Sequence, residues 1–462
     1  MMDQQHVLHL LNRIGFGYHP KLVQLLSKQS RNETVQQLFL EFNKSIPLQV
    51  IDDQLSKADF KSTTPEDRKE KKEQIKELTH TLNAAWFAQI CDFQNVVRNR
   101  MVYFWFNHFV CKSSNIVFAQ RYHNILMEHA FDNLASLTIA VSQSAAMLSY
   151  LNNRQNRKEA PNENFARELL ELYLLGHGNY SELDVKEAAR AFTGWRFIGN
   201  GVFQFRSTDH DHGIKTFLGQ TGNFNGYDII SICLQQQACA HHIAKSIYLH
   251  FVNDEVNDDE VNQVAQKLLK SNYNIYETMK FLFNSDWFYR EEHIQQKLKT
   301  PIQLLATVAN TFNAVPTSND KLWKLQNLLD EVIMYPPNVG GFPKGMAWID
   351  SASLIQRLRL PSMLLNGGIL NMDMEQDAAA EDPYMMQHKL QYQKNVSRYE
   401  WQMDWKKFEA NFVEGNKLEK LSFILFNNAL STEVLSSLFT IHENSAKVIA
   451  LKLISLPEFQ MC

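Results

Sequence analysis

Residues that could carry out acid–base chemistry are concentrated between Pro161 and Trp195, in the stretch PNENFARELLELYLLGHGNYSELDVKEAARAFTGW. Helical spacing of 100° per residue puts an apolar set on one side of the first helix and a polar set on the other. The apolar set is Phe165, Leu169, Leu172 and Tyr173, and the polar set is Glu163, Asn164, Arg167, Glu168 and Glu171. Leu174 and Leu175 fall on the polar side in the last turn. We interpret this as a polar face that runs under leucines and could line a cleft.

A histidine follows an aromatic stripe in VVRNRMVYFWFNHFV. Val97, Met101, Phe104 and His108 have the spacing i, i+4, i+7, i+11, which puts His108 on the same side as core residues. One interpretation is a core histidine that donates to a backbone carbonyl. The other is a catalytic or metal-binding imidazole.

Two loops carry further candidates. In FRSTDHDHGIKTFLG (205–219), an extended chain would point His210 and His212 one way and Asp211 the other. This pair lacks a third metal ligand nearby, so a hydrogen-bonded loop that closes over a cavity is the alternative. The loop 334–350 contains too much proline and glycine for a helix, so side chains such as Asn338 and Trp348 must hold it. It could equally be a structural corner.

Helical patterns dominate the rest of the chain, with clear start and stop signals. Thr64-Pro65-Glu66-Asp67 predicts a helix start, and Ser181 with Asp184 predicts a capping box. The fold class is therefore mostly α, a large multi-helical fold with long irregular loops and little β-structure. We expect an N-terminal lobe (1–230) with the main motifs and a C-terminal lobe (231–462) with a surface excursion at 371–399, or one continuous domain.

The composition of the chain limits which classes of partner and which cellular compartment we expect. The chain has 462 residues, a formal net charge of −4 and five cysteines without close pairs. This charge gives no reason to expect nucleic acid, and unpaired cysteines are typical of a reducing compartment. The sequence shows neither a signal-peptide pattern nor an apolar run long enough to cross a membrane. We therefore expect a cytoplasmic protein that is not inserted in membranes.

Seven phrases in order resemble the bacterial domain-of-unknown-function family 1800, a group without an established activity. They are HLLNRIGFG (9–17), MVYFWFNHF (101–109), NENFARELLEL (162–172), GNYSELDVKEAARAFTGW (178–195), HDHGIKTFLG (210–219), PPNVGGFPKGMAWI (336–349) and LPEFQ (456–460). The resemblance implies a mostly helical protein. It also marks residues that lie in the family's motifs: His108, Asn162, Glu163, Asn164, Arg167, Glu168, Arg190, Trp195, His210, Asp211, Lys215, Asn338 and Trp348.

The chain departs from this family in two places. Many relatives look exported and carry a leader, whereas the first motif here begins within ten residues of the first methionine. Gln143-Ser144 stands where the family usually has His-Pro, so a role for a histidine there is not available. The resemblance also suggests a partner, the product of a neighbouring gene from an uncharacterised sulfatase-like family.

One hypothesis for the motif residues is a hydrolase-like enzyme with a His/Glu/Asp/Arg cleft. The catalytic residues would be His108, Glu168, His210 and Asp211, which could also bind a divalent metal ion such as iron, manganese or zinc. The substrate-binding residues would be Asn162, Asn164, Arg167, Arg190, Trp195, Lys215, Asn338 and Trp348. Hydrolysis is favoured because the sequence contains no nucleotide-binding fingerprint.

The alternative is a non-catalytic binding or assembly protein in which the same groups form a structural network. Glu163 would pair with Arg167 at i, i+4, and Glu168 or Glu171 would pair with Arg190. The sequence leaves the choice between enzyme and scaffold open.

Overall fold

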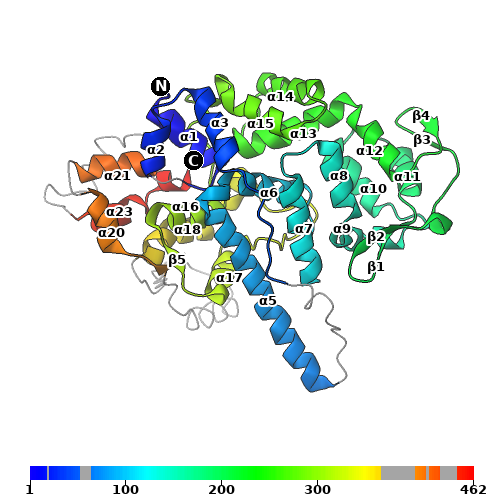
Figure 1. Cartoon of the computed structure of the whole chain (residues 1–462), viewed down its shortest axis with the longest axis horizontal. Coiled ribbons are helices and arrows are strands. Elements are labelled where there is room, and N and C mark those ends of the chain that lie inside the picture. The colour runs from blue at the N-terminus through cyan, green and yellow to red at the C-terminus, as the bar shows by residue number, and fades with distance from the viewer. Residues whose placement is uncertain (18–19, 52–63, 366–400, 413–415, 427–444) are drawn as a thin grey trace.

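The computed structural model describes the chain except for residues 18–19, 52–63, 366–400, 413–415 and 427–444. The predicted excursion at 371–399 lies outside the described residues. The fold is mostly α-helical, as predicted, and its small strands form two-stranded pairs (Figure 1).

The helices lie in neighbouring groups across the long axis of Figure 1. At the end that holds both termini are α1 (Gln4–Ile14), α2 (Pro20–Leu26), α3 (Arg31–Glu41), α20 (Trp405–Glu409), α21 (Lys417–Phe426) and α23 (Ala446–Leu453). Below α1 lie α16 (Pro301–Phe312) and α18 (Ser351–Leu365), and the middle contains α5 (Pro65–Cys91), α6 (Val96–His108), α7 (Ile116–His129) and α17 (Asn319–Leu328). The other end contains α8 (Leu134–Gln143), α9 (Ala145–Tyr150), α10 (Asn164–Glu168), α11 (Glu182–Ala191) and α12 (Gly226–Leu234). Along the top, α13 (Gln237–Phe251), α14 (Asp258–Lys270) and α15 (Ile275–Asn284) lead back from that end to α3.

Short strands and single helical turns connect these helices. The antiparallel pairs are β1 (Trp195–Ile198) with β2 (Val202–Phe205), β3 (Lys215–Phe217) with β4 (Gln220–Gly222), and β5 (Val315–Pro316) with β6 (Trp401–Gln402). A π-helical turn spans Leu169–Leu174. The 3₁₀ turns are Phe93–Asn95, Asn153–Gln155, Ser207–Asp209, Trp287–Tyr289, Gly345–Trp348, Ala410–Phe412 and Pro457–Gln460.

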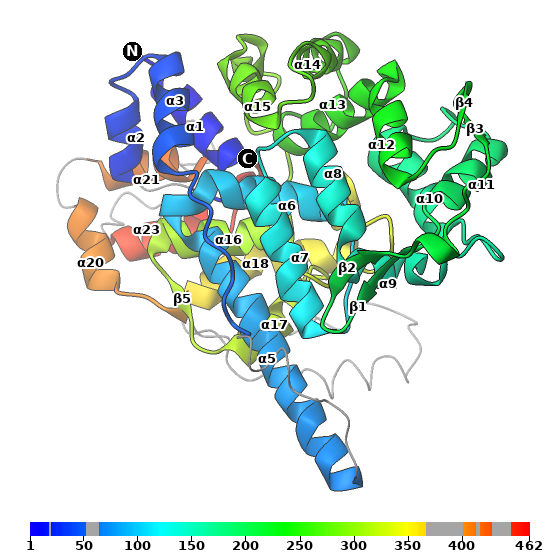
Figure 2. The ribbon, with the colours of Figure 1, turned by 45° about the vertical axis from the view of Figure 1, so that its right-hand side comes forward.

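Start signals in the sequence correspond to real helix starts. The Thr64 side chain caps α5 with Pro65 in its first turn, and Ser181 forms a capping box with Asp184 at α11. The first half of α5 carries the charged run and projects from the body, as Figure 2 shows. Most of the charged side chains of this run are therefore exposed to solvent.

The core is continuous from α1 to the last 3₁₀ turn. Helix α6 lies in its middle and is buried on almost every side, as expected of a helix that is apolar all round. One large apolar cluster extends across residue 230. The division into lobes at that residue stays a prediction.

Candidate functional site

A π-helical turn ends the helix that begins with α10. The amide of Leu175 donates to the carbonyl of Leu170 at 2.9 Å, five residues back instead of four. This wider turn rotates the following side chains, so Leu174 is buried although α-helical spacing puts it on the polar face. Both leucines at the end of this helix are buried in the core, and the interpretation that the polar face lines a cleft stays a prediction.

Two histidines from other helices donate hydrogen bonds to the last carbonyls of this helix. The last carbonyls of a helix have no partner within it. His108 Nε2 donates to the carbonyl of Tyr173 at 2.8 Å, and His242 Nε2 on α13 donates to the carbonyl of Leu172 at 2.9 Å. The two ring centroids lie 6.0 Å apart. Each Nδ1 then carries a lone pair, because a neutral imidazole has one proton.

Both imidazoles are neutral at physiological pH. Burial, together with the neighbouring His242, lowers the pKa of His108 to about 3. Burial also lowers the pKa of His242. Gly176 leaves room beside this ring, since a Cβ there would lie 2.8 Å from His242 Nδ1. The pair is thus held in the neutral form, with a lone pair on each Nδ1.

The two stripes of side chains that contain these histidines face each other along α6 and α13. Arg100, Phe104 and His108 follow each other on α6, and the ring of His250 on α13 lies 5.1 Å from that of Phe104. Arg100 is 1% exposed, and its Nε and Nη1 have no hydrogen-bond partner among the described residues. Its guanidinium lies 5.0 Å from the centre of the Phe16 ring. Burial lowers the pKa of Arg100 to about 10.

More buried cations lie around this contact between α6 and α13, which we call the histidine seam. Arg13 donates through Nη2 to the carbonyl of His293 at 2.7 Å. Lys297 forms an ion pair with Asp254, and Lys299 donates to the carbonyl of Phe459 at 2.7 Å. Arg13 and Lys297 lower the pKa of His250 through like charge, and Arg13 also lowers that of Lys297. Buried cations therefore lie close to His250.

The loop 334–350 brings another cation to the same place. Gly341 packs against Val110 and the backbone of Asn107, so the loop lies over the end of α6. Lys344 lowers the pKa of His108 and of His242 by like charge. Of the two predicted holding residues, Trp348 is buried against Phe342, whereas Asn338 is exposed and accepts from the Gly340 amide.

A second polar region surrounds Arg190 at the end of α11. Arg190 Nε donates to Asp211 Oδ2 at 2.7 Å, and its Nη1 donates to both oxygens of Glu187 at 2.9 and 2.8 Å. Asp211 Oδ1 accepts from the Gly213 amide, and Lys215 Nζ donates to the carbonyls of Asp211 and Gly213. We call Glu187, Arg190, Asp211 and Lys215 the loop network. It holds the 205–219 loop onto α11.

His210 and Trp195 lie beside the loop network. His210 Nδ1 donates to the carbonyl of Thr193 at 2.9 Å, and its ring lies 4.9 Å from that of His212, on the shared side predicted from the sequence. Trp195 is 1% exposed and packs against Phe192 and Phe203. Both side chains help to pack the loop and the hairpin.

The remaining predicted residues lie on or near the exposed face of α10. Arg167 pairs with Glu163 at 3.0 Å, as predicted, and with Glu182 at 2.7 Å. Asn162 Oδ1 accepts from the Asn164 amide. Glu168 is half-buried, and burial raises its pKa. The predicted pairing of Glu168 or Glu171 with Arg190 is wrong, because Arg190 is occupied by Glu187 and Asp211.

The predicted site residues thus fall into three sets. Arg190, His210, Asp211 and Lys215 come together, Arg167 lies with Glu163, and His108 contacts α13 and the π-helical turn. No hydrogen bond or ion pair joins His108 to His210, Asp211 or Glu168 among the described residues. Their catalytic and metal-binding roles stay predictions.

One further cluster has the composition of a metal site. Glu260, Glu292 and His293 bring their ligand atoms within 4.8 Å of one another. However, His293 Nδ1 accepts from Asn253, and its Nε2 donates to Glu260 at 3.1 Å. Arg290 and Tyr248 also donate to Glu260. These bonds satisfy the cluster without a metal ion, so we interpret it as a buried polar brace.

Comparison with known proteins shows which family the chain belongs to. A sequence model described as "Protein of unknown function (DUF1800)" matches residues 9–461. The chain belongs to the DUF1800 family. No curated protein and no solved structure gave a significant match. The end of α6, the π-helical turn and the 334–350 loop meet at the histidine pair.

Membership of DUF1800 does not test partners or location. Among the described residues, no helix is long and apolar enough to span a bilayer. The expectations of no nucleic acid, of a cytoplasmic location and of a sulfatase-like partner stay predictions.

Sequence reasoning missed His242, His250, Arg100 and Lys344. Arg100 could have been found, since it lies four residues before Phe104 on the stripe that contains His108. His242 and His250 are eight residues apart, which puts them about two turns, or roughly 12 Å, apart on the same broad side of α13. Lys344 gave no such signal, because the course of its loop is set by tertiary contacts.

Proposed function

We propose that the protein is a hydrolase-like enzyme whose general base is the pair His108 and His242. The observation that carries this proposal is the shared tautomer of the two rings. Each ring gives its Nε2 proton to a carbonyl of the same helix end, at 2.8 and 2.9 Å, and keeps a lone pair on Nδ1. A fixed neutral imidazole is the form that accepts a proton from an attacking water or hydroxyl group.

Charge around the pair supports an anionic or carbonyl-bearing substrate. Lys344 and the buried Arg100 are close enough to lower the pKa values of histidines on the seam. Positive groups near a base stabilise the negative charge that develops when water attacks a carbonyl or phosphoryl centre. This proposal keeps His108 from the predicted set and does not require Glu168, His210 or Asp211.

The test compares neighbouring histidines on α13. We expect the protein to hydrolyse p-nitrophenyl acetate or p-nitrophenyl phosphate, and His242→Gln and His108→Gln to lower kcat by about 10²- to 10⁴-fold. His241→Gln is the matched control, because His241 is exposed and adjacent to His242. Its activity should equal that of the wild type.

The pH profile adds a second readout. A base with a pKa near 3 stays deprotonated, so the rate should not fall between pH 8 and pH 5 as it would with an ordinary imidazole. Hydrolysis that survives in both His108→Gln and His242→Gln, or no hydrolysis of either ester, would overturn the proposal.

The second candidate is the binding or assembly protein. The loop network favours it, since every carboxylate of that network has a cationic or amide partner within the chain. Closed networks of this kind hold elements together and leave no charged group for a substrate.

A further inference from the structure

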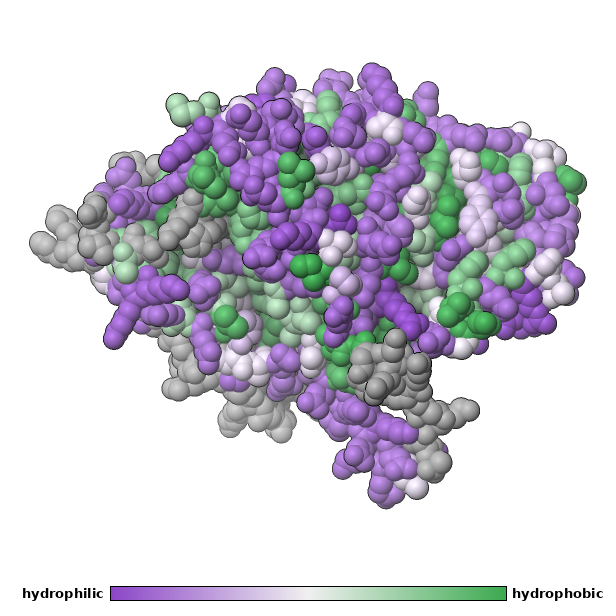
Figure 3. Space-filling model, viewed as in Figure 1, coloured by the Kyte–Doolittle hydropathy of each residue, from purple (hydrophilic) through white to green (hydrophobic). Residues whose placement is uncertain are grey.

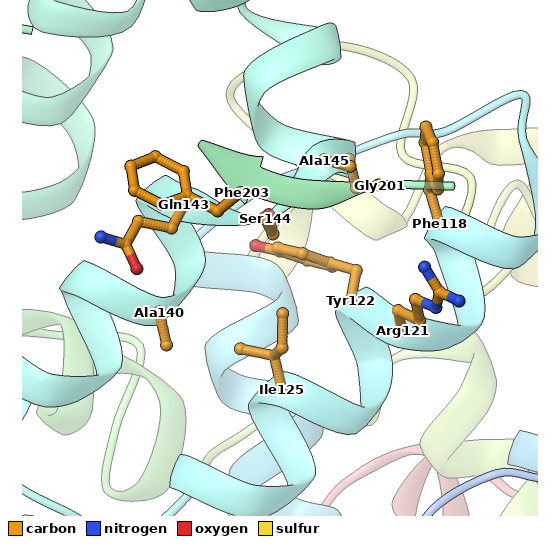
Figure 4. Close-up of a pocket in the computed structure, with 11 residues that line it drawn as sticks. Phe118, Arg121, Tyr122, Ile125, Ala140, Gln143, Ser144, Ala145, Gly201 and Phe203 are labelled. Carbon is orange, nitrogen blue, oxygen red and sulfur yellow. The ribbon is translucent and has the colours of Figure 1, made fainter. Parts of the chain in front are cut away.

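A pocket of about 240 Å³ lies between α7, α8, α9 and the β1–β2 hairpin, and neither His108 nor His242 lines it (Figure 4). Eleven residues line it: Phe118, Arg121, Tyr122, Ile125, Ala140, Gln143, Ser144, Ala145, Ala146, Gly201 and Phe203.

The walls of the pocket are mainly apolar. Aromatic and aliphatic side chains from α7 and α8 face the backbone of the hairpin (Figure 4). Gly201 has φ +98°, and a Cβ at this position would lie 2.7 Å from the Phe118 ring. Glycine is thus required where the hairpin turns close to α7. A green patch over the hairpin in Figure 3 shows that the surface beside the pocket is apolar too.

Most polar groups of the lining are already used within the protein. The Ser144 hydroxyl donates to the carbonyl of Val141 at 2.7 Å, and the Tyr122 hydroxyl donates to the carbonyl of Phe109. Gln143 Nε2 donates to the Tyr227 hydroxyl at 2.6 Å. These groups fix the walls and are not free to bind an ion.

Arg121 is the exception. Its Nη1 donates to the carbonyl of Asn200, and none of the ion pairs among the described residues involves it. The eleven lining residues contain no aspartate or glutamate. Figure 4 shows Arg121 beside Phe118 at one end of the pocket and Gln143 at the other. A half-buried guanidinium in an apolar pocket attracts one negative charge, and its planar fork fits a carboxylate.

We propose that this pocket binds a small organic monocarboxylate with an aromatic or branched apolar body. The carboxylate pairs with Arg121, and the body lies against Phe118, Ile125 and Phe203. The pocket is smaller than the ~300–1,000 Å³ of sites for drug-sized ligands, so the ligand is a compact metabolite-sized acid. This inference does not depend on the proposed hydrolase activity.

Isothermal titration with three ligands of one shape tests the charge requirement. Phenylacetate should bind, whereas the neutral phenylacetamide and the cationic phenethylamine should bind at least tenfold more weakly. Equal affinity for phenylacetate and phenylacetamide would overturn the role of Arg121. No binding of phenylacetate at millimolar concentration would overturn the site.

Three variants locate the binding. Arg121→Gln removes the charge and should weaken phenylacetate binding at least tenfold, and Ala140→Leu should fill the pocket and abolish binding. Arg154→Gln is the control, because Arg154 lies 4.6 Å from the Phe197 ring of the same hairpin and does not line the pocket. Circular dichroism confirms that each variant is folded. Unchanged affinity in Arg121→Gln, or a loss in Arg154→Gln as large as that in Arg121→Gln, would refute the proposal.

Discussion

The loop network and the histidine pair differ in how completely their polar groups are bonded. In the loop network, Arg190 donates to Asp211 and Glu187, and Asp211 also accepts from a backbone amide. At the histidine seam, each ring uses one nitrogen, and the buried Arg100 leaves Nε and Nη1 without partners. Complete bonding is typical of structural braces. Incomplete bonding of buried groups needs another explanation, such as a ligand.

Acidification should destabilise the histidine seam and the loop network at different pH values. This should be the largest of the expected effects. The folded pKa of His108 is about 3, below its ordinary value near 6.5, so its contribution to stability is fully present above pH 6.5 and is lost as the pH falls towards 3. His9 and His250 have pKa values lowered by burial in the same direction. Each such histidine costs about 1.4 kcal/mol per pH unit in this window.

The loop network should respond at lower pH. Arg190 holds the pKa of Asp211 below its ordinary value of 3.8. Its contribution is therefore present above pH 3.8 and is lost as the pH falls through the lowered folded pKa. Urea unfolding from pH 7 to pH 3 measures the loss of stability. Hydrogen exchange of residues 205–219 and 169–176 shows whether the loop or the π-helical turn opens first. Loss of protection in the loop before the π-helical turn would contradict the comparison.

Breaking the loop network should have an intermediate effect. Arg190→Gln leaves the half-buried Glu187 and Asp211 without their cation, and we expect a loss of about 2 to 3 kcal/mol in the free energy of unfolding. Arg167→Gln is the matched control on the surface, since Arg167 and Glu182 are 33% and 71% exposed, and it should cost less than about 1 kcal/mol. Equal losses in urea unfolding would show that the loop network is not a brace.

Glu168→Gln should have the smallest effect. Glu168 is half-buried, burial raises its pKa, and no hydrogen bond or ion pair engages its carboxylate among the described residues. A neutral isostere removes a desolvated charge, so we expect the free energy of unfolding at pH 7 to change by less than about 0.5 kcal/mol. Thermal unfolding checks this, and a loss of more than about 3 kcal/mol would place Glu168 in a buried network.

Local signals predicted much of the helical fold. Two helix starts, Thr64 with Pro65 and Ser181 with Asp184, depend on contacts within one turn. The local sequence is therefore enough to predict them. Tertiary partners were harder to predict. The i, i+4 pair of Glu163 and Arg167 was found, but the partners of Arg190 were not. Asp211 reaches Arg190 from a loop 21 residues away, whereas Glu187 lies three residues before it and could have been found from helical spacing.

Sequence predicted the hydrogen bond of His108 only as one of two interpretations. The ring donates to a backbone carbonyl, as the structural interpretation expected, yet this bond occupies only Nε2. The second histidine lies 134 positions further along the chain, and no periodicity connects it to His108. Neither His242 nor the positive surroundings could be inferred without knowing how α6 and α13 pack.

The π-helical turn also determines how this chain tolerates a change in length. A π-helical turn holds an extra residue compared with an α-helical one. Deleting one residue within Leu169–Leu174 would therefore return the segment to α-helical phase and shift the last carbonyls away from both imidazoles. A shortened chain could keep its core and still lose the alignment of His108 with His242, so segment length is as important here as residue type.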